Sequence, residues 1–489
     1  MGIIVRQSIT NSIITYVGIG LGFVLTIILY PHILAPEQYG LTRVLISASF
    51  ICSQFAHLGV QRLVIRYYPF FRKVAPDSHG LLFWTLVIPF GGFLIFTILY
   101  LVFNDILIGV YSDRSPLFVD YYLWVLPLTF FVLYYEVLNS YLRSLRDSTT
   151  GSLANEVLQR LLVIAVLALF FFEWISFWQF VLLFVISYSS QPLLVAYKIW
   201  QKEKFNLTPN YDILRKPLIK GMANFSLYSM LGGLTTILVW NVDVMMLGSM
   251  AGLEATAVYA IAFYVASVIT VPQRSIEKIA TPLLADFIKN KEWDEVSSIY
   301  QKTSINQLIL GTLIFGLIWV NLDLLFMILP DVYSAGKWVV FIIGIGKLSE
   351  MVTGANGIIL MNSKHYRVSF YTNIILVIVT ISANYLLIPV YGIEGAALAS
   401  AFAIFTYNAV KYFYLMIKMK LQPFTFQTFA VAFLGSVALF IAYSLLQFES
   451  IFVSVAVKSV AFVIIFFLPV LYFKFSPDLN DLIRKLMVK

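Results

Sequence analysis

Apolar runs of about 20 residues follow one another through nearly the whole sequence, separated by short polar connections. A helix needs about 20 apolar residues to cross the hydrocarbon core of a bilayer, where the backbone must satisfy its own hydrogen bonds. With 60% hydrophobic and only 12% charged residues, the chain has too few charges to cover a water-facing surface. The sequence therefore predicts an all-α integral membrane protein with about fourteen transmembrane helices.

The orientation follows from the lysines and arginines near the span ends, which resist translocation and mark the cytoplasmic side. Alternate connections hold 24 of them on one side and three on the other, namely Arg43, Arg114 and Lys337. An even number of spans places both termini on the same side, and this count places that side in the cytoplasm. The expected spans are 10–33, 41–60, 80–103, 119–141, 153–172, 177–197, 221–248, 254–280, 304–328, 336–361, 369–389, 393–417, 427–446 and 451–473.

Several functional classes are excluded by composition and missing motifs. The net charge of +8 comes from short basic clusters between spans, which indicates contact with membrane lipids and excludes nucleic acid as a partner. Cys52 is the only cysteine, so an internal disulfide and a CxxC site are excluded. The stretch Gly344–Ser349 only superficially matches a phosphate loop, because its first glycine is misplaced and Leu348 follows Lys347. No catalytic residue, metal or cofactor is expected.

Two similar turns indicate an internal repeat. The turn at residues 35–41 (APEQYGL) resembles the turn at 252–258 (GLEATAV), and their acids Glu37 and Glu254 lie 217 positions apart, close to the length of six spans. The sequence thus predicts a six-helix lobe at 1–200, a second at 201–417, and a helix pair with an amphipathic cytoplasmic tail at 418–489. Residues 281–304 and the tail 477–489 are expected to lie at the membrane surface.

Ionisable side chains inside spans are candidate sites, because each costs on the order of 2.5–3.5 kcal/mol near a helix centre unless it is paired or hydrated. Lys347 and Glu350 share one helix face, either as a self-neutralising pair or as the lining of a hydrated cavity. Arg274 lies a turn deeper than Glu277 and Lys278, which can reach the headgroups, and its guanidinium matches phosphate oxygens. We therefore expect Arg274 to face a ligand.

Other ionisable groups leave their roles open. Asp243 is either a cation or proton site or a structural polar group that pairs with Asn241 or another helix. Arg160 forms an i,i+4 pair with Glu156, as a structural salt bridge or as part of a substrate site. Arg43, at the outer edge of its span, is a further cavity candidate.

Several connections, and two stretches in the second half of the chain, contain recognisable sequence motifs. The stretches are Arg6–Ser12 (RQSITNS), Tyr30–Pro31, Leu34–Arg43 (LAPEQYGLTR), Tyr68–Arg72 (YPFFR), Asn241–Asp243 (NVD) and Pro389–Ala399 (PVYGIEGAALA). Together they resemble the polysaccharide transporter family, with its Wzx-type flippases, of the multidrug/oligosaccharidyl-lipid/polysaccharide exporter superfamily. The resemblance covers essentially the whole chain and rests on turn and packing signatures.

The resemblance implies a bacterial inner-membrane protein whose two lobes form a MATE-like V around a central cavity. An undecaprenyl-pyrophosphate-linked oligosaccharide, such as an O-antigen repeat unit of lipopolysaccharide, would cross through that cavity by alternating access. Arg274 falls in the span where that family often shows a cavity arginine, whereas the first span here has few charges. A coupling ion, H⁺ or Na⁺, and other polysaccharide assembly proteins are further implied partners.

Two competing functions stay open. A cation-coupled multidrug exporter of the same superfamily would need an acidic and aromatic cavity rather than a basic one. A membrane glycan polymerase or ligase would need a sizeable outer loop with catalytic basic residues, but the longest outer connection is 104–118 and its only such residue is Arg114.

Overall fold

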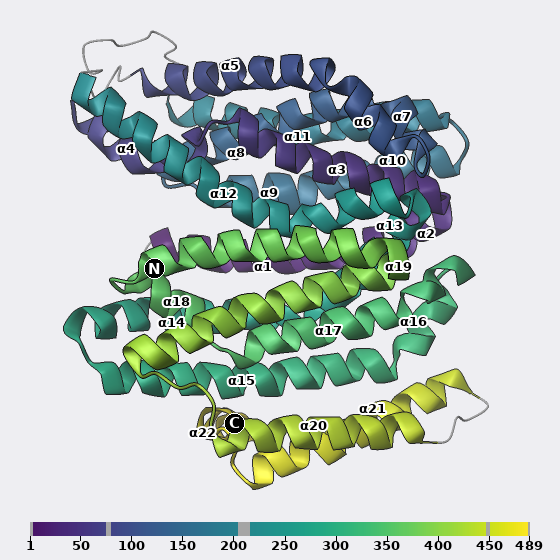
Figure 1. Ribbon diagram of the computed structural model, residues 1–489, viewed down its shortest axis with the longest axis vertical. Coiled ribbons are helices and arrows are strands. Elements are labelled where there is room, and N and C mark those ends of the chain that lie inside the picture. Colours follow the sequence, from purple (N-terminus) through teal and green to yellow (C-terminus); the bar gives the residue numbers. More distant parts are fainter. Residues whose placement is uncertain (1–2, 75–79, 204–215, 446–449, 488–489) are drawn as a thin grey trace. The chain divides into compact units, whose positions relative to one another are not determined.

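The computed structural model describes residues 3–74, 80–203, 216–445 and 450–487, and its regular elements in these ranges are helices (Figure 1). Internal contacts divide the chain into a first unit, Met1–Ala257, and a second unit, Val258–Lys489. The lobe boundary expected at residue 200 stays a prediction. Lys204, Arg215 and Lys489, counted above among the cytoplasmic cations, lie outside the described residues.

The first unit is built mainly from long apolar helices joined by short turns. In chain order they are α1 (Ile3–Phe23), a π-helical segment (Val24–Leu29), α2 (Tyr30–Ile33), α3 (Pro36–Ala56), α4 (Val60–Val74), α5 (Leu81–Val102), α6 (Asn104–Tyr111), α7 (Pro116–Tyr121), α8 (Val125–Ser144), α9 (Thr149–Leu153), a second π-helical segment (Ala154–Leu158), α10 (Gln159–Phe171), α11 (Phe177–Lys202) and α12 (Lys216–Met250).

The second unit has the same character. After α13 (Leu253–Ser267), which crosses the boundary between the units, come α14 (Val271–Asn290), α15 (Trp293–Val320), α16 (Leu322–Ile328), a 3₁₀ turn (Asp331–Gly336), α17 (Lys337–Val352), α18 (Asn356–Asn362), α19 (Tyr366–Tyr414), a third π-helical segment (Leu415–Met419), α20 (Phe426–Ser444), α21 (Ile451–Tyr472) and α22 (Pro477–Met487).

These helices confirm the all-α membrane fold. Ten helical segments among the described residues are long and apolar enough to span a bilayer, and thirteen when each of three bent helix pairs counts as one span. One of the ten, Tyr366–Met419, contains a break at Gly392, where the backbone has φ 55° and ψ −128°. The chain turns back there as a helical hairpin (Figure 1), so both expected spans, 369–389 and 393–417, lie within α19 and the π-helical segment that follows it.

The first unit is organised around α8, which packs against α3, α4, α5 and α11. Its buried face contributes Leu133, Val137 and Tyr141 to an apolar cluster of this unit. α12 lies along α3 and α4 within the same unit. The side chains that face away from these contacts are apolar as well, as lipid contact requires.

The bend between α3 and α4 has a local cause. The chain turns by 45° at a break of three residues, where Leu58 and Gly59 both have positive φ. The buried His57 ring holds this break, because its Nδ1 accepts a hydrogen bond from the Gly59 backbone N–H at 2.9 Å. His57 thus has a structural partner at one ring nitrogen.

In the second unit, α15 packs against α14, α17, α20 and α21, and α17 packs against α19. The terminal pair α20 and α21 buries Phe462 and Phe466 against α15, whereas Phe426, Phe440 and Phe452 are exposed on its outer surface. The segment 281–304 comprises the end of α14, a tight turn and the start of α15, and its expected place at the membrane surface stays a prediction. The expected tail helix is present as α22.

Candidate functional site

A polar cluster in the first unit surrounds Arg43 of α3. The guanidinium donates to the Tyr39 hydroxyl from Nε at 3.0 Å and from Nη2 at 2.8 Å, and Nη2 also reaches Thr26 Oγ1 at 3.3 Å. Tyr30 stacks on Tyr39 with ring centroids 4.8 Å apart. All of these partners are neutral, and none of the ion pairs among the described residues includes Arg43.

Local backbone geometry brings these groups together. Thr26 lies in the π-helical segment Val24–Leu29, and such segments are frequent at functional sites. Tyr30 and Tyr39 lie on either side of the tight turn that follows, so the predicted Leu34–Arg43 signature folds into one aromatic and cationic group. Among the described residues no hydrogen bond from Arg43 Nη1 is found, so this cation has donors left for an anion.

Arg160 lies near this cluster but is more fully engaged. Its Nη2 pairs with Glu156 Oε2 at 2.7 Å, and its Nη1 donates to the Gly18 carbonyl of α1. Glu156 belongs to the second π-helical segment, Ala154–Leu158. Tyr188 of α11 interacts electrostatically with both Arg43 and Arg160, which joins the two arginines into one polar region of the first unit.

The second unit holds a separate charged cluster that includes the predicted pair. Lys347 Nζ lies 3.4 Å from Glu350 Oε2, and the Lys347 side chain is only 5% exposed, against 33% for Glu350. Lys347 also lies 6.0 Å from the centroid of the Phe263 ring. The two predicted residues are therefore brought together, with the cation inside and the carboxylate at the edge of the buried region.

Lys411, which the sequence analysis did not single out, belongs to the same cluster. It is buried, its Nζ lies 3.5 Å from the centroid of the Tyr407 ring, and it interacts electrostatically with Glu350 and Glu277. The sequence did contain a signal for Lys411, because a lysine inside the expected span 393–417 is a candidate site residue. The cluster thus combines two cations with two carboxylates.

The other predicted residues have different surroundings. Arg274 is exposed on α14 and makes no hydrogen bond or ion pair within the described part of the chain, which leaves its guanidinium accessible. On the same helix, Glu277 accepts a hydrogen bond from Gln273 at 2.9 Å. Asp243 is buried within α12. Glu136 of α8 was also not singled out by the sequence analysis. One of its carboxylate oxygens is buried and has no hydrogen-bond partner in the described residues.

Ionic contacts fasten the predicted cytoplasmic end of the first unit. Lys202 Nζ lies 3.0 Å from the buried carboxylate of Asp147, which also accepts the Thr150 backbone N–H at 3.1 Å. Burial raises the pKa of Asp147, but the Thr150 N–H and the Lys202 ammonium outweigh it and hold the pKa below its ordinary 3.8. This clasp joins the turn before α9 to the end of α11.

Metal binding has no support in the described residues, where no group of three histidine, cysteine or acidic side chains could hold an ion.

Comparison with known proteins gives the family and the fold. The sequence profile described as "Polysaccharide biosynthesis protein" matches residues 4–288. No curated protein matches the chain in sequence. The structure resembles lipid II flippase MurJ in its inward closed conformation with a TM-score of 0.70 and 13% identity, over 98% of this chain and 100% of MurJ.

Multidrug transporters have the same fold. An inward-facing multidrug resistance MATE family transporter of the MOP superfamily matches with a TM-score of 0.63 and 16% identity, over 86% of this chain and 98% of that one. A mutant of the Vibrio cholerae MATE transporter VcmN matches with a TM-score of 0.56 and 12% identity, over 86% of this chain and 98% of the transporter. At these identities the structures establish the fold.

The family profile covers more than half of the chain and confirms the resemblance drawn from the turn signatures. The chain is a multi-pass integral membrane protein with a MurJ- and MATE-like fold, and it belongs to the polysaccharide biosynthesis protein family.

Proposed function

We propose that this protein carries an undecaprenyl-pyrophosphate-linked oligosaccharide, a repeat unit of a surface polysaccharide such as O-antigen, across the bacterial cytoplasmic membrane by alternating access. Membership of the polysaccharide biosynthesis family and the likeness to a lipid II flippase support a lipid-linked glycan as the substrate class. The basic connections support a topology with both termini in the cytoplasm. Transport of this kind needs no covalent step.

The observation that carries the proposal is the Arg43 guanidinium, which is held by the neutral hydroxyls of Tyr39 and Thr26. A charge within a span is costly unless it serves a partner or lies in water. Because a guanidinium presents parallel N–H donors that match phosphate oxygens, a pyrophosphate is a suitable partner. Tyr39 and Thr26 orient the group without neutralising it.

The other cations extend this proposal. We also assign Arg274, exposed on α14, Lys347, paired with Glu350, and Arg160, paired with Glu156, to substrate contact. The pyrophosphate would exchange water for these cations, while the polyprenyl tail stays in the lipid. Asp243 is the assigned ion-coupling residue, with H⁺ or Na⁺ as the coupled ion.

The rival with a specific observation in its favour is a cation-coupled drug exporter. Glu277 and Glu350 supply carboxylates next to the aromatic ring of Tyr407, and MATE transporters share the fold. A polymerase or ligase is disfavoured by the short outer connections.

The deciding experiment deletes the gene and measures lipid-linked oligosaccharide on each leaflet. The proposal predicts accumulation on the cytoplasmic leaflet, restored to normal by the wild-type protein and by Arg72→Gln, which removes an exposed cation of α4. Arg43→Gln should restore less than about a tenth of export at equal protein level, because losing a charge-assisted hydrogen-bonded pair costs at least about 1.5 kcal/mol. Arg43→Lys should restore an intermediate amount, since a lysine keeps the charge but not the fork.

Unchanged lipid-linked oligosaccharide after deletion would refute the proposal. If deletion instead sensitises cells to cationic drugs, the exporter reading takes its place. Full export by Arg43→Gln would remove Arg43 from the substrate site.

A further inference from the structure

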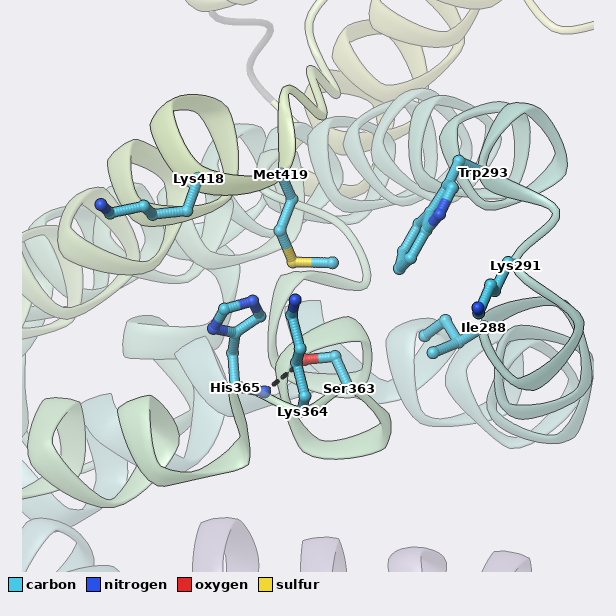
Figure 2. Close-up of a pocket in the computed structure, with 8 residues that line it drawn as sticks. All are labelled: Ile288, Lys291, Trp293, Ser363, Lys364, His365, Lys418 and Met419. Atoms are coloured by element: carbon cyan, nitrogen blue, oxygen red, sulfur yellow. Dashed lines mark hydrogen bonds between the residues drawn. The ribbon is translucent and has the colours of Figure 1, made fainter.

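A pocket of about 510 Å³ opens in the second unit where the ends of four membrane-spanning segments meet (Figure 2). It lies at the end of α14, the start of α15, the turn between α18 and α19, and the end of the third π-helical segment. The candidate spans on these elements end or begin at Asn290, Trp293, Asn362, Tyr366 and Met419. The pocket therefore lies at the ends of candidate spans, on the side that the basic connections predict to be cytoplasmic. Its lining residues are Ile288, Lys291, Trp293, Ser363, Lys364, His365, Lys418 and Met419.

The pocket has a fixed framework. Ile288 and Met419 also pack on an apolar cluster that includes the buried Leu284, Ile359 and Leu415. Hydrogen bonds hold the turn before α19: the Ser363 hydroxyl donates to the Leu360 carbonyl at 3.0 Å and accepts the His365 backbone N–H at 3.1 Å.

The His365 ring is fixed in the same way. Its Nδ1 lies 2.7 Å from the hydroxyl of Tyr414 on α19, and the two rings meet edge to face. Residues from four elements thus form a preorganised wall, which lowers the cost of ordering a ligand there.

Positive charge surrounds the opening. Figure 2 shows the Lys364 side chain rising through the middle of the pocket toward Met419, with the His365 ring on one side and Trp293 on the other. Lys291 and Lys418 lie on opposite sides of the rim, with the Lys418 ammonium turned outward. None of the ion pairs among the described residues includes these three lysines.

No acidic residue among those that line the pocket neutralises this charge. Glu292, Asp294 and Glu295 are exposed at the start of α15, and the pocket lining contains none of them. The lining itself therefore combines three ammonium groups and an imidazole with an apolar and aromatic wall. An anion with an attached apolar part suits such a lining better than a bare ion.

We propose that this pocket binds the phosphodiester headgroup of an anionic phospholipid from the cytoplasmic leaflet. The ligand chemistry is a phosphoryl group held by lysines, and the lipid source follows from the position and the walls. Ile288, Trp293 and Met419 suit the glycerol and upper acyl chains, and tryptophan is typical of the membrane interface. Basic pockets between spans on the cytoplasmic side are suited to anionic headgroups. The site does not depend on the transported substrate.

The test measures lipid retention by the purified full-length protein with native mass spectrometry after incubation with equal amounts of phosphatidylglycerol and phosphatidylcholine. The wild type should retain phosphatidylglycerol selectively. Lys364→Gln/Lys418→Gln should lower that retention by roughly 5-fold for each lysine removed, because each basic residue near an anionic surface contributes about 1 kcal/mol. The matched control Lys302→Gln/Lys474→Gln removes two exposed lysines of the same unit outside the pocket and should match the wild type.

Further arms distinguish the source of the phosphoryl group. Equal retention by the pocket variant and the wild type, or equal loss in both double variants, would overturn the proposal, because binding would then follow bulk charge or another surface. Displacement of phosphatidylglycerol by millimolar inorganic phosphate would assign the site to soluble phosphate and overturn the lipid source. Preferential retention of undecaprenyl phosphate over an equal amount of phosphatidylglycerol would assign the site to the carrier lipid and overturn the proposal.

Discussion

Gly40, near the start of α3, lies directly against the backbone of Leu253, the first residue of α13. A Cβ atom built on Gly40 would collide with the Leu253 carbonyl oxygen. The two residues belong to the two turns whose sequences resemble each other, at 35–41 and 252–258. Within the first unit, the matched turns therefore touch through a glycine that leaves no space for a side chain.

This contact predicts that Gly40→Ala destabilises the protein by about 1–3 kcal/mol, since the added methyl group must push two helices apart. The matched control is Gly20→Ala in α1, where nothing lies within 4 Å of the added Cβ. That control should be neutral or slightly stabilising, because alanine is the better helix former. Thermal melting of both variants in detergent measures the difference, and equal melting temperatures would refute the close contact.

The unequal burial of Lys347 and Glu350 predicts an order of stabilities. Glu350→Gln leaves the buried Lys347 and Lys411 with less negative charge and should destabilise the fold by roughly 1–3 kcal/mol, below the range for breaking a fully buried pair because Glu350 is partly exposed. Lys347→Gln leaves Glu350 at the edge, where water and the Lys411 ammonium still stabilise its charge, and should cost less. Thermal melts of the two purified variants test this order, and the reverse order would contradict it.

The clasp at Asp147 predicts a pH dependence. Because the folded-state pKa lies below the ordinary 3.8, the stabilising contribution of the carboxylate is present at neutral pH and is lost as the pH falls through the folded-state pKa. The wild type should thus melt at a higher temperature than Asp147→Asn at pH 7, and the gap should narrow below about pH 4. A melting series between pH 3 and pH 7 checks it, and a gap that stays constant would show that the charge is unimportant.

The break in α19 predicts that Gly392→Ala destabilises the hairpin by about 1–3 kcal/mol, because φ 55° with ψ −128° is a conformation that only glycine adopts readily. No neighbour lies within 4 Å of a Cβ at Gly392, so the effect would come from the backbone alone. Gly91→Ala, inside α5 with equally open surroundings, is the control and should leave the melting temperature unchanged or raise it. Equal behaviour of the two variants would count against backbone strain.

Hydropathy alone fixed the class of the protein. Each expected span falls on helical segments, two of them on α19, because the requirement for about 20 apolar residues acts on each segment independently of the others. The local sequence also predicts the division of α19, because Tyr391–Gly392 interrupts the apolar run. The turn signatures were sufficient to identify the family, because each is a run of consecutive residues that can be recognised without the tertiary structure.

Only the tertiary structure decided how the charged residues group. Periodicity paired Lys347 with Glu350 three residues away, but not with Lys411, which lies 64 positions further along the sequence from Lys347. Hydropathy likewise gave no indication that Arg43 would meet Thr26 through a π-helical turn, or that α4 would continue α3 after a bend at His57. Helix rotation and packing set such contacts, and they depend on every neighbouring helix at once. The sequence of a span determines that it crosses the membrane, whereas its neighbours determine which side chains it presents to one another, to lipid or to a ligand.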